Sequence, residues 1–233
     1  MENFVEILND IIQENMGTID KIVSKQIKRN GFDPAGGSSS GSADTGEIGY
    51  GGVSLECKLK YDVKGLTGLS NSSFQKLHID TVHVSPGTHR FSGTGSFKFG
   101  SRNHLTAHGS GSVTGTFNNW FKDISESVSV GAKATINGYY LSGRVSVTGV
   151  IKNNKVTIES MIIEESNTHI GDIDVDVNGL GMFNPVINLV AEAFANGFAT
   201  LASNALDGLF PLVNNVIEAK ALPISVDVKE LAA

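Results

Sequence analysis

The sequence predicts an α+β protein in which long antiparallel strands curl around a long C-terminal helix. Three observations predict this: an amphipathic helical pattern near the N-terminus, a two-residue apolar period with recurring turn signals across 53–178, and a strongly apolar helical segment across 184–220. A chain of 233 residues is long enough to bury a substantial core as a single domain, 1–233. With 27 glycines and only 5 prolines, it suits long strands joined by tight turns better than a helical bundle.

The first predicted element is a helix within residues 1–31. Apolar side chains follow the three-four spacing of one helical face from residue 3 to residue 29. Asn30 and Gly31 are suited to a C-cap, and Pro34 bars continuation of the helix. The sequence therefore predicts a helix that buries one face and ends near residue 30.

The next segment, 34–52, is rich in glycine and serine and has almost no apolar content, so we expect a flexible tether there. An antiparallel sheet then follows across 53–178. Asn137-Gly138 is the strongest hairpin signal in that region, and several predicted strands exceed the usual length of about five or six residues. The expected strands lie near 54–66, 74–84, 88–99, 103–117, 126–136, 139–151, 156–165 and 171–178.

The C-terminal helix is predicted across 184–220, and its 184–210 portion is apolar enough to raise the question of a membrane span. A narrow polar stripe that includes Glu192 and Asp207 runs along this portion. Two carboxylates would cost several kcal/mol in a bilayer. We therefore expect a helix that is largely enclosed by the curved sheet, with one edge exposed to water.

This layout resembles a known group of proteins. The resemblance rests on "NGFDPA" (30–35) at the end of the first helix, the Gly/Ser tether and the hairpin series. It continues through "THIGDIDVDVNGLGMFNPVINLV" (168–190), which leads from a late strand into the long helix. The chain resembles the group-seven mite allergens and, more distantly, the takeout and juvenile-hormone-binding proteins, within the tubular lipid-binding superfamily that includes bactericidal permeability-increasing protein. Takeout-type proteins usually carry an N-terminal disulfide, which Cys57 alone cannot form.

The resemblance implies a super-roll with an apolar tunnel for a lipid-like ligand, and it implies a secreted protein. No basic-then-apolar leader precedes residue 4, so any signal peptide is expected to have been removed or never to have been present. Asn71 begins the single glycosylation sequon, which matters only in a secreted chain. The net charge of −6 argues against a nucleic-acid partner.

Catalytic and metal-binding patterns are weak in this sequence, so we expect no enzyme and no metal site. Residues 37–41 match the letters of a nucleophile elbow but lie in the predicted tether. Asp172, Asp174 and Asp176 alternate as on the wet face of a strand, and the glycine and glutamate that a calcium loop needs are missing. His104 and His108 share a strand face but lack a third ligand.

The informative pattern is the repeated placement of glycine on strand faces that should be packed. Such glycines either let strands bend and the helix approach closely, or they border space for a ligand, and the sequence leaves both interpretations open. The predicted lining residues are Phe91, Gly93, Gly95, Phe97, Phe99, Gly109, Gly111, Phe117, Phe194, Phe198 and Leu201.

We therefore predict a non-enzymatic carrier of a hydrophobic small molecule, such as a lipid, isoprenoid, sterol or carotenoid pigment, with no other cofactor. Arg90, Lys98 and Arg144 alternate away from the packed face, which favours a neutral ligand. One alternative is a surface-acting protein that touches membranes or microbial lipids through apolar tips, and Trp120-Phe121 is either such a tip or a plug under a loop. Another is an interaction module without a ligand.

Overall fold

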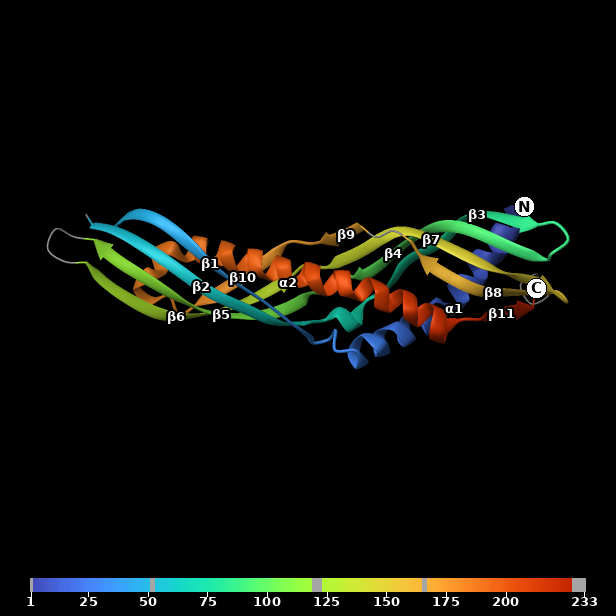
Figure 1. Cartoon of the computed structure of the whole chain (residues 1–233), viewed down its shortest axis with the longest axis horizontal. Coiled ribbons are helices and arrows are strands. Elements are labelled where there is room, and N and C mark those ends of the chain that lie inside the picture. The colour runs from blue at the N-terminus through green and yellow to red at the C-terminus, as the bar shows by residue number, and fades with distance from the viewer. Residues whose placement is uncertain (1, 51–52, 119–122, 165–166, 228–233) are drawn as a thin grey trace.

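The computed structural model describes residues 2–50, 53–118, 123–164 and 167–227. The protein is elongated, and helix α2 (Ile187–Val216) runs along the long axis while helix α1 (Glu2–Arg29) lies toward the end that carries both chain ends (Figure 1). Short helical turns precede β3 (η1, Leu69–Asn71) and flank α2 (η2, Gly181–Val186; η3, Ile217–Ala221). The strands are β1 (Ala35–Tyr50), β2 (Val53–Thr67), β3 (Ser73–Ser85), β4 (Arg90–Ser101), β5 (Leu105–Asn118), β6 (Ile124–Ile136), β7 (Tyr139–Lys152), β8 (Lys155–Ile163), β9 (Asn167–Ile170), β10 (Ile173–Asn178) and β11 (Ile224–Asp227).

The predicted fold class is confirmed: long antiparallel strands curve around a long C-terminal helix, and an N-terminal amphipathic helix packs beside them. The strands form two sheets rather than one. Sheet A has the order β1-β2-β5-β6-β10, and sheet B has the order β11-β8-β7-β4-β3, with β9 paired to β7. The chain crosses between them after β2, β4, β6, β9 and β10, so strands that neighbour each other in sequence do not all form hairpins.

The prediction of a flexible tether across 34–52 is wrong, because residues 35–50 form β1 and pair antiparallel with β2. Backbone hydrogen bonds do not need apolar side chains, and β2 supplies a long partner strand that is anchored in the core by Leu55, Leu59 and Val63. The small residues of β1 allow neighbouring side chains to pack closely against the strand. Gly41 faces the ring of Tyr61, and a Cβ at Gly37 would lie 3.4 Å from Cδ1 of Leu201 in α2. Glycine here reflects the close approach of helix and sheet rather than disorder.

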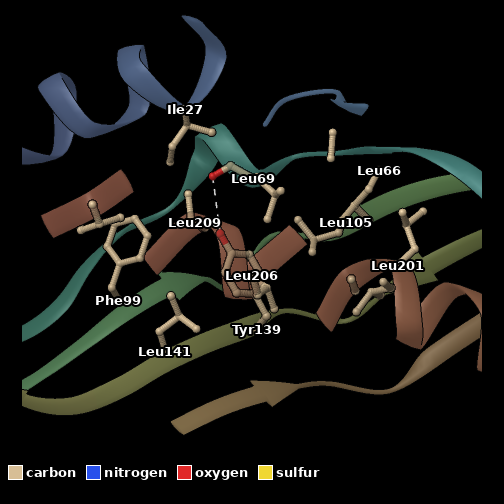
Figure 2. Close-up of a cluster of buried hydrophobic side chains, with 14 of the residues drawn as sticks. Ile27, Leu66, Leu69, Phe99, Leu105, Tyr139, Leu141, Leu201, Leu206 and Leu209 are labelled. Carbon is tan, nitrogen blue, oxygen red and sulfur yellow. Dashed lines mark hydrogen bonds between the residues drawn. The ribbon is translucent and has the colours of Figure 1, made fainter. Parts of the chain in front are cut away.

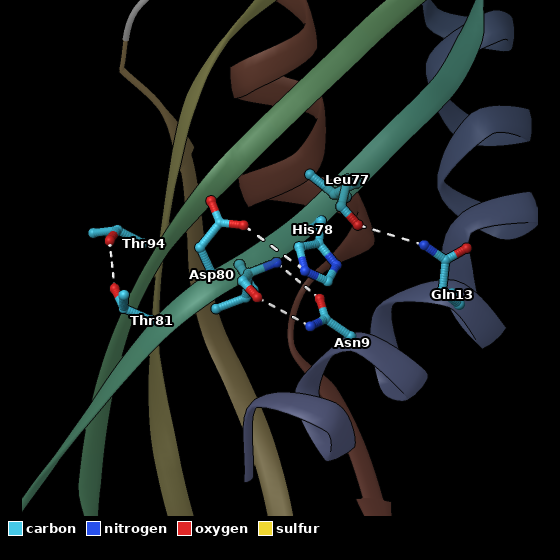
Figure 3. Close-up of polar contacts among 8 residues, drawn as sticks. Asn9, Gln13, Leu77, His78, Asp80, Thr81 and Thr94 are labelled. Carbon is cyan, nitrogen blue, oxygen red and sulfur yellow. Dashed lines mark hydrogen bonds and ion pairs between the residues drawn. The ribbon is translucent and has the colours of Figure 1, made fainter. Parts of the chain in front are cut away.

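Helix α1 covers sheet B and also covers the edge of that sheet. The centre of its apolar face is buried, while Asn9 reaches the backbone of edge strand β3 (Figure 3). The Asn9 amide donates to the carbonyl of Ile79 at 3.0 Å, and the Ile79 N–H donates back to Asn9 at 2.8 Å. Gln13 donates to Leu77 at 3.5 Å, and the Asp20 carboxylate accepts the Phe74 N–H at 2.9 Å. Side chains of α1 thereby form hydrogen bonds with backbone N–H and C=O groups that would otherwise be unpaired at the edge of the sheet.

The core is continuous where the two sheets and the two helices meet (Figure 2). Tyr139 of β7 is only 2% exposed, and its hydroxyl hydrogen-bonds to Ser72 and to the Leu69 carbonyl. Burial is the main cause that raises the pKa of Tyr139. The cluster around it joins Ile27, Leu66, Leu69, Phe99, Leu105, Leu141, Leu201, Leu206 and Leu209.

Helix α2 is long and apolar enough to cross a membrane by length and composition alone, a test that core helices also pass. In this structure it packs against β1, β2 and β10 and reaches β8 near its C-terminal end. There the Asn214 side chain exchanges hydrogen bonds with the backbone of Ile163 at 2.8 and 2.9 Å. The expectation of an enclosed helix with one wet edge is confirmed, since Phe194, Phe198 and Leu206 are buried while Glu192 and Asp207 are exposed.

Candidate functional site: the seam between β1 and α2

The candidate site is the seam where β1, the edge strand of sheet A, lies along α2. Two hollows open on this seam. The Phe32 hollow, about 250 Å³, is lined by residues 30–32, 35–38, 201, 204 and 205. The Leu189 hollow, about 200 Å³, is lined by Ala43, Asp44, Leu59, Leu189, Val190, Glu192, Ala193 and Asn196. Both have apolar floors, and the charged side chains that line them are the carboxylates Asp44 and Glu192.

Beneath the seam, aromatic rings lie over glycines. A Cβ at Gly109 of β5 would lie 2.7 Å from Cε1 of Phe194, and a Cβ at Gly115 would overlap the ring of Phe183. On the helix, a Cβ at Gly197 would lie 2.7 Å from Cε2 of Tyr61. The inward space that these glycines leave is therefore filled by rings, and the interior between α2 and sheet A is closed in this conformation.

The rings form two separate groups along α2. The centroids of Phe194 and Phe198 are 6.2 Å apart, and those of Tyr61 and Phe194 are 5.5 Å apart. Phe117 and Phe183 form a second pair near the start of the helix, with their ring centroids 6.2 Å apart. Because aromatic rings can rotate about χ1 and χ2, they can rearrange more readily than the branched aliphatic side chains of the sheet itself.

The structure divides the eleven predicted lining residues between the two sheets. Gly109, Gly111, Phe117, Phe194, Phe198 and Leu201 lie between sheet A and α2. Phe91, Gly93, Gly95, Phe97 and Phe99 belong to β4 in sheet B, where Phe91 meets Phe4 of α1 at 5.3 Å and Phe99 meets Phe74 at 4.9 Å. The two groups do not form one site, because β4 and β5 belong to different sheets. The sequence alone contains no sign of this division.

The two interpretations of the inward glycines can be compared one position at a time. Gly95 faces a bulge in β3, where a Cβ would overlap the carbonyl oxygen of His78, and Gly111 faces the carbonyl oxygen of Lys60 in the same way. A Cβ at Gly93 would lie 3.0 Å from the carbonyl oxygen of Thr81. These three glycines allow close backbone approach, which is the strand-bending interpretation. Gly109 differs, since its neighbours are movable rings.

Several residues of the seam were missed by sequence reasoning, among them Phe32, Leu59, Leu189 and Ala205. Phe32 was overlooked because it follows the helix and precedes the supposed tether. Its ring packs on Gly208 of α2, where a Cβ would lie 2.9 Å from Cε1. Gly208 was the feature of the sequence that could have indicated this contact, because a glycine on a helix allows another element to pack closely against it.

The other features singled out from the sequence do not form a catalytic or metal site within the described residues. Within the described ranges, no group of three or more His, Cys, Asp or Glu side chains could hold a metal ion. Asp174 and Asp176 are exposed on β10 and alternate with half-buried valines, which confirms the wet strand face, and Asp174 accepts a hydrogen bond from Asn137 at 2.8 Å. The elbow-like residues 37–41 lie within β1, with no helix after them. Asn71 is exposed at the end of η1, and Trp120-Phe121 lies outside the described residues.

Comparisons with known proteins give similarity in structure only. No model of a known protein family matches the sequence, and no curated protein matches it. The chain is similar to Takeout 1 of Epiphyas postvittana at 12% identity, with a TM-score of 0.36, over 93% of this chain and 92% of that one. It is also similar to lipopolysaccharide binding protein at 13% identity, with a TM-score of 0.30, over 90% of this chain but 38% of that one. Neither is a mite allergen, so the group-seven resemblance stays a prediction.

Proposed function

We propose that this protein binds an apolar small molecule between α2 and sheet A and carries it, without catalysing a reaction. The observation that carries the proposal is the placement of aromatic rings over glycines between α2 and sheet A, together with two hollows that open on the seam. A ligand that enters at the seam would displace the rings of Phe194 and Phe198 and occupy the space over Gly109. Each 100 Å² of apolar ligand surface removed from water contributes roughly 2.5 kcal/mol, which would offset the cost of displacing these rings.

The charges around the seam limit the class of ligand. Asp44 and Glu192 line the Leu189 hollow, and no lysine, arginine or histidine lines either hollow. Lys98 lies over the ring of Tyr140 and Arg90 pairs with Glu159, both on sheet B. A free fatty acid would therefore bring its carboxylate toward like charge. The proposed ligand is neutral, for example an isoprenoid, a sterol, a carotenoid or a neutral lipid.

Organic extraction of the purified protein, followed by mass spectrometry and an absorption spectrum, tests the proposal. We expect a neutral apolar compound in near-stoichiometric amount, or uptake of an added sterol or retinoid probe by ligand-free protein. Filling the hollow with Ala205→Phe should weaken probe binding by about tenfold or more, which corresponds to about 1.4 kcal/mol. The control Ala219→Phe places a ring on an exposed position beyond α2 and should leave binding unchanged. Equal binding by both variants, or no binding of any apolar probe, would contradict the proposal.

A second candidate function is contact with a membrane surface, favoured by exposed apolar side chains at the sheet A end of the molecule. Ile124 at the start of β6 is 49% exposed, and Met182 in η2 is 54% exposed. They lie at the same end, since Ile124 pairs with Phe117, whose ring stacks on Phe183 beside Met182. Flotation with phosphatidylcholine vesicles tests this. Association that Ile124→Ser and Met182→Ser abolish would support it, and absence of flotation would exclude it.

We also propose that the protein is secreted, as expected for a carrier of a poorly soluble compound. The sequon is sterically usable, because Asn71 is exposed at the end of η1. Expression through a eukaryotic secretory pathway should add a glycan that Asn71→Gln removes, as read from the mass of the intact protein. Retention of the chain inside the cell would count against secretion.

A further inference from the structure

The free edge of β1 is the longest sheet edge in the described part of the protein. β1 has 16 residues and its one strand partner is β2, whereas the other edge strand of sheet A, β10, has 6. In an antiparallel pair about half of a strand's N–H and C=O groups face the partner, and the rest point away from it. Natural edge strands are usually blunted by lysine, proline or a covering element. β1 contains no lysine, arginine or proline.

The regular part of this edge is the stretch Ser38–Asp44, which pairs without interruption with β2 between two irregularities. At about 3.3 Å per residue it is roughly 23 Å long. The Phe32 hollow borders β1 at residues 35–38, and the Leu189 hollow borders it at Ala43 and Asp44. A hollow therefore lies at each end of the uninterrupted edge.

The spacing of the hollows matches the geometry of an added strand. Gly37 and Ala43 lie six residues apart and both face α2, with Gly37 beside Leu201 and Ala43 packed against the core. A strand paired to β1 would likewise direct alternate residues toward α2, because side chains repeat with a period of two. Two of its side chains, six positions apart, would reach the two hollows.

We propose that β1 accepts an extended peptide segment of a partner protein, which adds an antiparallel strand to sheet A. Main-chain hydrogen bonds to the edge would supply affinity, and the two hollows would take apolar side chains and so give sequence specificity. The carboxylate of Glu192 at the Leu189 hollow favours a basic residue next to the side chain that enters there. This inference goes beyond the proposed function, since an apolar small molecule makes no use of edge amides.

A second copy of this chain is a poorer fit. If β1 paired with itself, the inward residues offered to the hollows would be Ser39, Gly41 and Ala43, which are too small to fill cavities of about 200 and 250 Å³. The charged residues that each copy of β1 would bring are also acidic. Bulky apolar side chains with an adjacent base must therefore come from a different sequence.

The test uses a synthetic peptide of about ten residues, a usual upper length for a strand. It carries Lys-Leu near its N-terminus, a second Leu six positions after the first, and Thr or Val elsewhere. A control peptide has the same side chains but N-methyl groups on the alternate amides that would face β1. Fluorescence anisotropy measures affinity, and amide exchange by NMR reports on residues 38–44. We expect saturable 1:1 binding, slowed exchange at alternate β1 amides, and at least about tenfold weaker binding of the N-methylated peptide, equal to 1.4 kcal/mol or more.

Two protein variants locate the binding. Leu189→Asp should weaken peptide binding by about tenfold or more, because it places a charge in one hollow. Ile162→Asp is the matched control, since Ile162 is 44% exposed on sheet B and Leu189 is 41% exposed on the seam. Equal affinity for the methylated peptide, equal effects of both variants, or peptide-free dimers with protected β1 amides would overturn the proposal. The last result would instead assign the edge to a second copy.

Discussion

The edges of β3 and β1 show two opposite ways to end a sheet in one chain. At β3, the side chains of Asn9 and Gln13 from α1 hydrogen-bond to backbone groups of the edge strand (Figure 3), and Asp20 accepts a further backbone N–H of that strand. At β1, the neighbouring helix α2 offers hollows instead, and the strand itself consists mainly of glycine and serine. The first edge is closed by specific hydrogen bonds and is structural. The second is accessible from the seam, which is why both proposals concern it.

The largest expected effect is at the bulge of β3, where Gly95 touches the backbone. A Cβ at Gly95 would overlap the His78 carbonyl, so Gly95→Ala should lower the free energy of unfolding by about 3 kcal/mol or more. Gly17→Ala is the matched control, because nothing lies within 4 Å of a Cβ there and α1 should gain about 0.5–1 kcal/mol of stability. Urea unfolding followed by circular dichroism measures both. A Gly95→Ala protein as stable as the wild type would refute the close-approach interpretation.

The next effect concerns the covered edge itself. Asn9→Ala removes the reciprocal pair of hydrogen bonds to Ile79 and leaves its backbone groups without those partners, which should cost about 1–3 kcal/mol. Asn15→Ala removes a bond to the Ile11 carbonyl within α1 itself and should change stability by less than about 0.5 kcal/mol. If both variants lose the same stability, the edge contact has no special role.

Asp20 makes the covered edge sensitive to pH. Burial raises the pKa of the Asp20 carboxyl above its usual value, although the hydrogen bond from Phe74 works in the opposite direction. A raised pKa in the folded state means that the folded protein binds more protons between the unfolded and folded pKa values, so this group favours folding at low pH and loses that contribution as pH rises. Asp20→Asn keeps an acceptor for Phe74. Its stability relative to wild type should therefore increase from pH 3.5 to pH 7, and a relative decrease over that range would contradict the sign of the pKa shift.

The smallest expected effect is on β1. Ser40 is exposed, so Ser40→Lys should alter the free energy of unfolding by less than about 0.5 kcal/mol. The same change places a charged side chain on the strand whose edge we propose as a docking site. A large loss of stability would show that this edge is already occupied within the folded chain.

Much of the fold was predictable from the sequence, because period and turn signals are local. The predicted helix across residues 3–29 corresponds to α1 at Glu2–Arg29. Asn137-Gly138 does separate β6 from β7, but the predicted hairpin there is wrong, because these two strands belong to different sheets and do not pair. The predictions that failed concern non-local contacts. The partition of β4 and β5 into separate sheets and the pairing of the Gly/Ser segment with β2 depend on contacts between distant residues, which no window of sequence displays.

The candidate site was predictable only in part, for the same reason. Phe194, Phe198 and Leu201 were selected from the apolar face of the helix and do lie at or beneath the seam. The prediction could not choose between Gly95 and Gly109, which look alike in sequence. Gly95 faces a backbone carbonyl and Gly109 faces aromatic side chains, and the difference arises from which strand or helix lies opposite.

The most direct test of the account is photolabelling with a neutral long-chain alkyl diazirine, followed by peptide mapping of the labelled protein. If the ligand space lies between α2 and sheet A, label should concentrate in residues 35–44 and 189–205, and Ala205→Phe should reduce it there. The covered edge should remain unlabelled across 2–29 and 73–85. Label concentrated on α1 and β3, with none along the seam, would contradict the account.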